Sequence, residues 1–150
     1  MAEQNWNRVI ERTLPSCQGA HLETMQEILC ELRQLGWSDR ELFGIEMALE
    51  ESLTNAIRHG NCFDTTKQVD VLCKLSNSHF WLRVEDEGPG FSPEDVPDCT
   101  DDAHLEECGG RGLMLIRAYM TRVEYCGRGN CVVMEKVRGD TDSNLVDVAS

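Results

Sequence analysis

The chain has 150 residues, of which 41% are hydrophobic and 27% are charged, a balance typical of one globular domain with a single core. Its 27 acidic and 14 basic residues give a formal net charge of -13, which repels nucleic-acid phosphates and anionic membrane surfaces. We therefore expect no direct nucleic-acid partner and no membrane partner, and proteins or small molecules instead.

The N-terminal segment MAEQNWNRVIERTLP lacks the basic start and apolar run of a secretory signal, and no stretch is long enough to span a membrane. These features predict a cytoplasmic protein. The eight cysteines are scattered without a C-x-x-C pair, so reduced thiols that pack as small hydrophobic side chains are favoured over disulfides or a metal site.

The first predicted element is an edge strand over residues 6–14, since its mixed apolar and polar pattern ends at Pro15. From Ser16 to Gly36 the apolar residues recur every three or four positions, which predicts an amphipathic helix. Its apolar stripe consists of Leu22, Met25, Ile28, Leu29, Leu32 and Leu35.

A second helix is predicted from Ser38 to Gly60. Ser38 and Glu41 have the spacing of a capping box, in which each side chain satisfies a backbone donor at the helix start. The following Gly60-Asn61 supplies a stop signal. The apolar stripe of this helix consists of Leu42, Ile45, Leu49, Leu53, Ala56 and Ile57.

The second half of the chain predicts two adjacent antiparallel strands over residues 69–75 and 80–84, because apolar and polar residues alternate in both. Residues 87–110 have no periodicity and predict a long functional loop. A helix over 112–120 and a closing hairpin around 127–130 follow. We expect residues 1–138 to form one domain with helices stacked on one face of a sheet, and residues 139–150 to be an acidic, disordered tail.

Glu51, Asn55 and His59 are spaced by four on the second predicted helix and form one polar stripe away from its apolar stripe. A solvated helix face would explain this spacing equally well. Asp86 is more informative, because continuing the alternation of the preceding strand places its carboxylate on the core side of the sheet. A buried carboxylate needs a donor, such as the exocyclic amino group of a purine. Alternatively, the strand ends earlier and the side chain turns into solvent.

Two glycine-rich segments accompany these residues. Gly88 and Gly90 permit a tight turn and close backbone approach immediately after Asp86. Gly109, Gly110 and Gly112 open the third predicted helix, where free N–H groups and the helix dipole favour a polyphosphate. Each segment alone is also common in ordinary turns.

In this order along the chain, the segments EESLTNAIRHGN, DEGPGF and GGRGLMLI resemble the ATP-binding domain of the GHKL superfamily. Within it, the segment FGIEMALEESLTNAIRHGN is most similar to the small anti-sigma-factor serine/threonine kinases, and the resemblance runs from about Trp6 to Arg138. It implies the GHKL (Bergerat) ATP-binding fold, a two-layer α/β sandwich with a mixed, mainly antiparallel sheet.

The resemblance also implies roles for individual residues. Glu51 would be the general base, Asn55 would ligate Mg²⁺, and Asp86 would bind the adenine amino group of ATP. The backbone at Gly88 and Gly90 would pass close to the nucleotide. The remaining phosphate contacts would come from Gly110, Gly112, and secondarily His59 and Arg111.

The function implied by the resemblance is an ATP-dependent serine/threonine protein kinase that phosphorylates an anti-sigma-factor antagonist and regulates transcription by sequestering a sigma factor. A non-catalytic module in which ATP sets the conformation that binds a partner is the alternative. The catalytic part of a two-component histidine kinase ranks lower, since no helix pair with a phosphorylatable histidine precedes the domain. The sequence leaves open whether the domain forms a homodimer.

One feature departs from the resemblance. Family members often place a basic residue in the loop near the phosphates, whereas residues 86–110 contain nine acidic residues and no Lys or Arg. Either Arg111 compensates for this charge, or the acidic loop serves protein recognition.

Overall fold

The computed structural model describes residues 5–88, 116, 119–127 and 130–139. In chain order its elements are β1 (Arg8–Pro15), α1 (Leu22–Gln34), α2 (Asp39–Asn55), the π-helical turn η1 (Ala56–Gly60), β2 (Gln68–Leu75), β3 (His79–Glu85), β4 (Arg122–Cys126) and β5 (Cys131–Val137).

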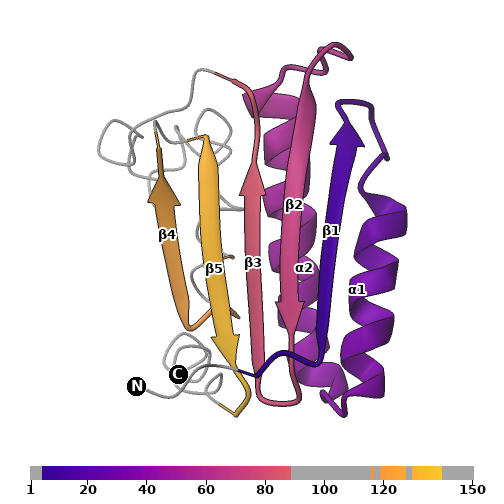
Figure 1. Ribbon diagram of the computed structural model, residues 1–150, viewed down its shortest axis with the longest axis vertical. Helices are drawn as coiled ribbons and strands as arrows, with labels where there is room; N and C mark the ends of the chain where they lie inside the picture. Colours follow the sequence, from indigo (N-terminus) through magenta and orange to yellow (C-terminus); the bar gives the residue numbers. More distant parts are fainter. Residues whose placement is uncertain (1–4, 89–115, 117–118, 128–129, 140–150) are drawn as a thin grey trace, which may run out of the picture.

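The strands form one five-stranded sheet in the order β1-β2-β3-β5-β4, and α1 and α2 cover one of its faces (Figure 1). The predicted two-layer sandwich, the edge position of β1, the β2–β3 hairpin and the closing β4–β5 hairpin are confirmed. All four pairings between the described strands are antiparallel, so the sheet is less mixed than expected in this part of the chain.

The core lies between the helices and the covered face of the sheet. Alternation along β2 and β3 directs every second side chain into it, as period-two patterning requires. The entire predicted stripe of the second helix is buried. Ile116 and Met120 also reach the core, and Met120 N donates to Ile116 O at 3.0 Å, consistent with the end of the third predicted helix. The rest of that helix, the predicted loop beyond Gly88 and residues 140–150 of the predicted tail lie outside the described residues. The first residue of that tail, Gly139, is described, and its N–H donates to Glu41.

The prediction for the start of the first helix is wrong. The helix begins at Leu22 rather than near Ser16, because Gly19 adopts a φ of +83°, a left-handed conformation that interrupts a helix. The Ser16 hydroxyl instead donates to Lys67 O at 2.7 Å, which holds this segment against the start of β2. Leu22, expected in the apolar stripe, is 49% exposed.

The six described cysteines are free thiols, of which Cys73 and Cys131 are buried. Cys17, Cys30 and Cys62 are exposed, so the expectation that the cysteines serve as core residues is wrong for these three. Within the described ranges, no helix has the length and apolar character needed to cross a membrane.

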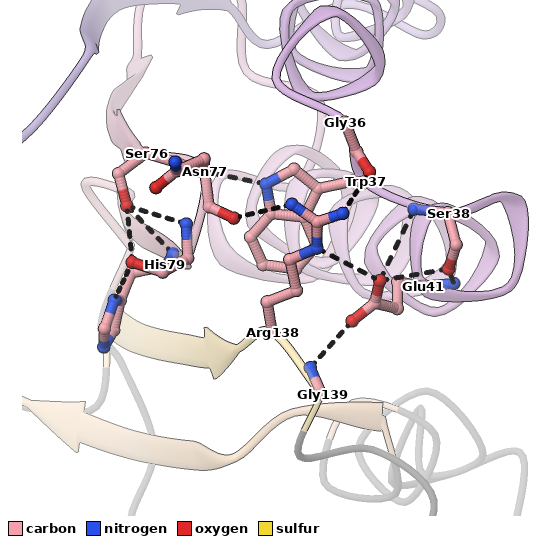
Figure 2. A network of polar contacts seen from close by, with 10 residues as sticks. Gly36, Trp37, Ser38, Glu41, Ser76, Asn77, His79, Arg138 and Gly139 are labelled. Carbon is pink, nitrogen blue, oxygen red and sulfur yellow. Dashed lines mark hydrogen bonds and ion pairs between the residues drawn. The ribbon is translucent and has the colours of Figure 1, made fainter.

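At the start of α2, the predicted capping box is present, and it belongs to a larger polar network (Figure 2). Arg138, just after β5, donates to the carbonyl oxygens of Gly36 and Asn77. Glu41 accepts from the Gly139 N–H at 2.9 Å and from the Ser38 hydroxyl at 3.0 Å. The network therefore joins the end of β5 to the β2–β3 turn and to the start of α2.

Replacing Glu41 by glutamine is expected to lower the free energy of unfolding by about 1–2 kcal/mol at neutral pH, because hydrogen bonds to a charged group are lost. Burial raises the pKa of Glu41, but the bonds from Gly139 and Ser38 and the nearby Arg138 outweigh it, so the pKa is lowered. A lowered carboxyl pKa contributes stability above the unfolded pKa and loses it as the pH falls through the folded one.

Urea unfolding would measure the difference in the free energy of unfolding between wild type and Glu41→Gln. This difference should shrink as the pH falls and the wild-type carboxylate becomes protonated. Glu46→Gln is the matched control, since Glu46 is an exposed glutamate of the same helix. A difference that stays constant with pH would contradict the charge-based explanation.

Candidate nucleotide site

The last two turns of α2 carry the first two candidate residues. Glu51 and Asn55 are four residues apart, so both lie on one side of the helix, and both are half-buried. Among the described residues, neither side chain makes a hydrogen bond to another residue, although the Glu51 backbone oxygen accepts from Thr54 at 3.4 Å. An acid and an amide thus lie on one side of the C-terminal half of α2.

The charge state of Glu51 is set by its surroundings. Burial raises the pKa of Glu51, and the neighbouring Glu50 raises it further, while His59 and Arg58 act in the opposite direction. Glu50 is itself held by His21 of the α1 N-terminus, with Nε2 and Oε2 2.8 Å apart. A carboxylate with a raised pKa is a better proton acceptor than an exposed one, provided that it remains ionised.

The predicted continuous α-helix is wrong in its final turn. After Asn55 the chain widens into η1, and Asn61 N donates to Ala56 O, five residues back, at 2.9 Å. This wider turn changes the direction of His59 relative to Glu51 and Asn55, and its side chain is exposed. Such π-helical turns are frequently found at functional sites.

Asp86 follows the last residue of β3, and its carboxylate lies against Gly60 at the end of η1. A Cβ built on Gly60 would come within 2.3 Å of Asp86 Cγ. Both alternatives for Asp86 therefore hold in part: the strand ends at Glu85, yet the side chain stays on the helix side of the sheet. The Gly88 N–H donates to Asp86 Oδ1 at 2.8 Å.

Positions 60 and 88 require glycine because neighbouring atoms leave no space for a Cβ atom, and neither residue has a positive φ. A Cβ on Gly88 would meet Gly60 O at 2.0 Å, so the backbones after β3 and after η1 touch directly. This contact places Asp86 against η1, which directly follows Asn55. Glu51 and Asn55 lie in the C-terminal half of α2, and Asp86 contacts η1, so the candidates are separated from the network of Figure 2, which lies at the start of α2.

Gly60→Ala is expected to displace the Asp86 carboxylate, since the methyl group has no space. Overpacking of this kind costs about 1–3 kcal/mol of stability, and ATP affinity should fall at least about tenfold. Thermal unfolding and calorimetric ATP titration would measure the two effects. In the control Gly44→Ala, the new Cβ meets Tyr119 Cδ1 at 2.9 Å, away from the site, so only stability should suffer. Wild-type ATP affinity in Gly60→Ala would contradict this assignment.

Four other predicted site residues, Gly90, Gly110, Arg111 and Gly112, lie outside the described residues. Two residues at the site were missed by the sequence reasoning. Asn61, 1% exposed, accepts from the Glu87 N–H at 2.8 Å, and Asn130 donates from Nδ2 to Asp86 O at 2.6 Å. The only sequence signal was the Gly60-Asn61 dipeptide, which was interpreted as a helix stop.

Comparison with known proteins decides the family. The family model of the histidine kinase-like ATPase domain matches residues 16–136, most of the chain. The chain belongs to this family. The resemblance to GHKL ATPases is therefore confirmed, and the matched range contains every candidate residue of the site.

Individual members of the histidine kinase-like ATPase family are similar to the chain over different lengths. It is 25% identical over 121 aligned residues to the serine-protein kinase RsbW of Oceanobacillus iheyensis, covering 76% of this chain and 77% of that protein. It is 29% identical over 108 residues to RsbW of Listeria monocytogenes, covering 67% of this chain and 69% of that protein. The sensor histidine kinase CpxA of Escherichia coli is 36% identical over 80 residues, which cover 49% of this chain but 17% of CpxA.

Membership of an ATPase family makes ATP the expected ligand, and the residues present fit it. The Asp86 carboxylate lies beside Gly60 and Gly88, where an added Cβ atom would clash. It can accept a hydrogen bond from an amino group. The Asn55 amide oxygen is a suitable neutral ligand for Mg²⁺, which prefers oxygen donors. Within the described ranges, no cluster of three or more His, Cys, Asp or Glu residues could hold a metal ion.

Proposed function

We propose that this chain is an ATP-dependent serine/threonine protein kinase of the anti-sigma-factor type. The observation that carries the proposal is the contact of η1 with the segment after β3 at Gly60 and Gly88, which places the Asp86 carboxylate against the helix that carries Glu51 and Asn55. The two serine-protein kinases RsbW, which match along most of their own length, support this reaction class.

In this function, Asp86 accepts a hydrogen bond from the adenine amino group, and the backbone at Gly88 passes close to the nucleotide. The backbone at Gly90 also passes close to the nucleotide, and the N–H groups of Gly110 and Gly112 donate to the phosphates. Further phosphate contacts come from Arg111 and His59. Asn55 holds Mg²⁺, which when bound neutralises charge on the phosphate oxygens.

Glu51 supplies the proton transfer. A serine or threonine hydroxyl of the partner attacks the γ-phosphorus of ATP, and its proton moves to the Glu51 carboxylate. The new O–P bond forms as the bond from the γ-phosphorus to the bridging oxygen breaks, and ADP leaves. The raised pKa of Glu51 favours this transfer, and the neutral Asn55 avoids placing a further negative charge beside the triphosphate.

The partners proposed are an anti-sigma-factor antagonist as the phosphate acceptor and a sigma factor as the sequestered protein, so the chain would regulate transcription without contacting DNA. The net charge of -13 agrees with a protein that does not bind nucleic acid directly.

The test is phosphotransfer in a lysate from a source strain lacking this gene, supplied with γ-thio-ATP, Mg²⁺ and either the wild-type chain or Glu51→Gln. We expect a thiophosphorylated serine or threonine on one small protein, with the wild-type chain only. ATP binding without any wild-type-dependent label would contradict the kinase function. It would favour the second candidate, an ATP-gated binding module, for which the acidic segment 86–110 without Lys or Arg is the supporting observation.

A further inference from the structure

Two asparagines bond to the backbone on either side of the Asp86 side chain. Asn61 lies directly after η1 and is 1% exposed. Its Oδ1 accepts from the Glu87 N–H at 2.8 Å, and its Nδ2 donates to Ser16 Oγ at 2.9 Å and to Gln68 O at 3.0 Å. One side chain therefore ties the residue after Asp86 to the end of β1 and the start of β2.

Asn130 holds the backbone of Asp86 itself. It precedes β5, and its backbone oxygen accepts from the Asp86 N–H at 2.9 Å while its Nδ2 donates to Asp86 O at 2.6 Å. The regular β3–β5 ladder ends at the Glu85–Cys131 pair, so these two bonds extend it by one residue. Both polar groups of the Asp86 backbone are thus fixed by Asn130.

We propose that Asn61 and Asn130 are positioning residues that fix the Asp86 carboxylate for selective recognition of the exocyclic amino group of adenine. The inference rests on the proposed role of Asp86 in ATP binding. It assigns to this pair of asparagines the nucleobase selectivity of the site.

The chemistry of the amide side chain suits this task. A neutral amide supplies donors and an acceptor together, so it can satisfy several backbone groups without adding charge next to a carboxylate. Since the bonds reach the peptide groups at 86 and 87, losing one lets the backbone rotate and moves the carboxylate away from its hydrogen-bonding direction. Gly88, whose N–H donates to Asp86 Oδ1, would move with it.

The experiment compares the affinities of ATP and inosine triphosphate, with Mg²⁺, by calorimetry. Inosine carries a carbonyl oxygen where adenine carries the amino group, so it faces the carboxylate with an acceptor instead of a donor. We expect the wild-type chain to prefer ATP by about 10- to 100-fold. In Asn61→Ala and Asn130→Ala this preference should fall to within about threefold, mainly through weaker ATP binding.

Ser16→Ala is the matched control, since it removes one Asn61 partner and leaves the bond to Glu87 N–H in place. Its ATP preference should remain that of the wild type even if its melting temperature falls. Asn130→Ala also covers the case in which Asn61→Ala fails to fold, because it deletes only the side-chain bond to Asp86 O and leaves the backbone bond from Asp86 N–H in place.

A purely structural role would lower the melting temperature of both alanine variants while leaving the ratio of the two affinities at the wild-type value. That result would overturn the positioning role and leave the proposed function standing. A wild-type chain that binds both nucleotides equally would instead refute adenine recognition by Asp86, and with it this inference.

Discussion

Asp86→Asn is expected to lower the affinity for ATP by about 100-fold or more in calorimetry with Mg²⁺. The asparagine keeps an oxygen that can accept from the Gly88 N–H, so the local turn should persist. Its other terminal atom becomes an NH₂ group, which presents a donor to the adenine amino group. The substitution removes a charge-assisted hydrogen bond and also places two hydrogen-bond donors opposite each other, and both effects lower the affinity for ATP.

Asp39→Asn is the control for the change of charge, because the Asp39 side chain is 96% exposed at the opposite end of α2. It should bind ATP as tightly as the wild type. If Asp86→Asn also retained wild-type affinity while remaining folded, Asp86 would not contact the nucleotide, and the proposed site would have to be rebuilt around other residues.

Much of the fold was predictable because its signals are local. The capping box of Ser38 and Glu41 needs only residues three apart, and the alternation in β2 and β3 depends on a period of two. The position of Pro15 at the end of an edge strand follows from its missing N–H. Each of these expectations depends on a few consecutive residues, and each is confirmed.

The errors arise where distant segments decide the local conformation. The first helix was expected to begin at Ser16, but the Ser16 hydroxyl donates to Lys67 O, 51 residues away along the chain. The widened turn η1 ends where Gly60 touches Asp86 and Gly88, a contact between segments about 26 residues apart that no helical periodicity encodes. Lys136 is fully buried in the core and donates to Tyr119 O at 2.7 Å, which a pattern of apolar residues could not reveal.

The candidate site divides in the same way. Glu51, Asn55 and Asp86 are chemically conspicuous residues at regular spacing or at a strand end, and the structure places Asp86 against η1, which follows the helix carrying the other two. Asn61 and Asn130 support the site through bonds to backbone atoms of another segment, so their residue type alone carries no signal.

Glu51→Gln is expected to reduce the rate of phosphotransfer by about 10²–10⁴-fold, the contribution typical of a general base. Glutamine has the same shape as glutamate but cannot accept the hydroxyl proton. ATP affinity should change little, because Glu51 is not assigned a contact with the nucleotide. Single-turnover phosphotransfer and calorimetry together separate these effects. Equal rates in Glu51→Gln and wild type would remove the role of general base.

The neighbouring Glu50→Gln provides both a control and a second test, since it removes a negative charge that raises the pKa of Glu51. In the wild type, activity should decline as the pH falls through this raised pKa, above the range of an ordinary glutamate, because protonated Glu51 cannot act as a base. Glu50→Gln should keep its rate at neutral pH and shift the acid limb of the profile to lower pH. An acid limb that stays in place would show that the titrating group is not Glu51, since removing the charge of Glu50 should lower the pKa of Glu51.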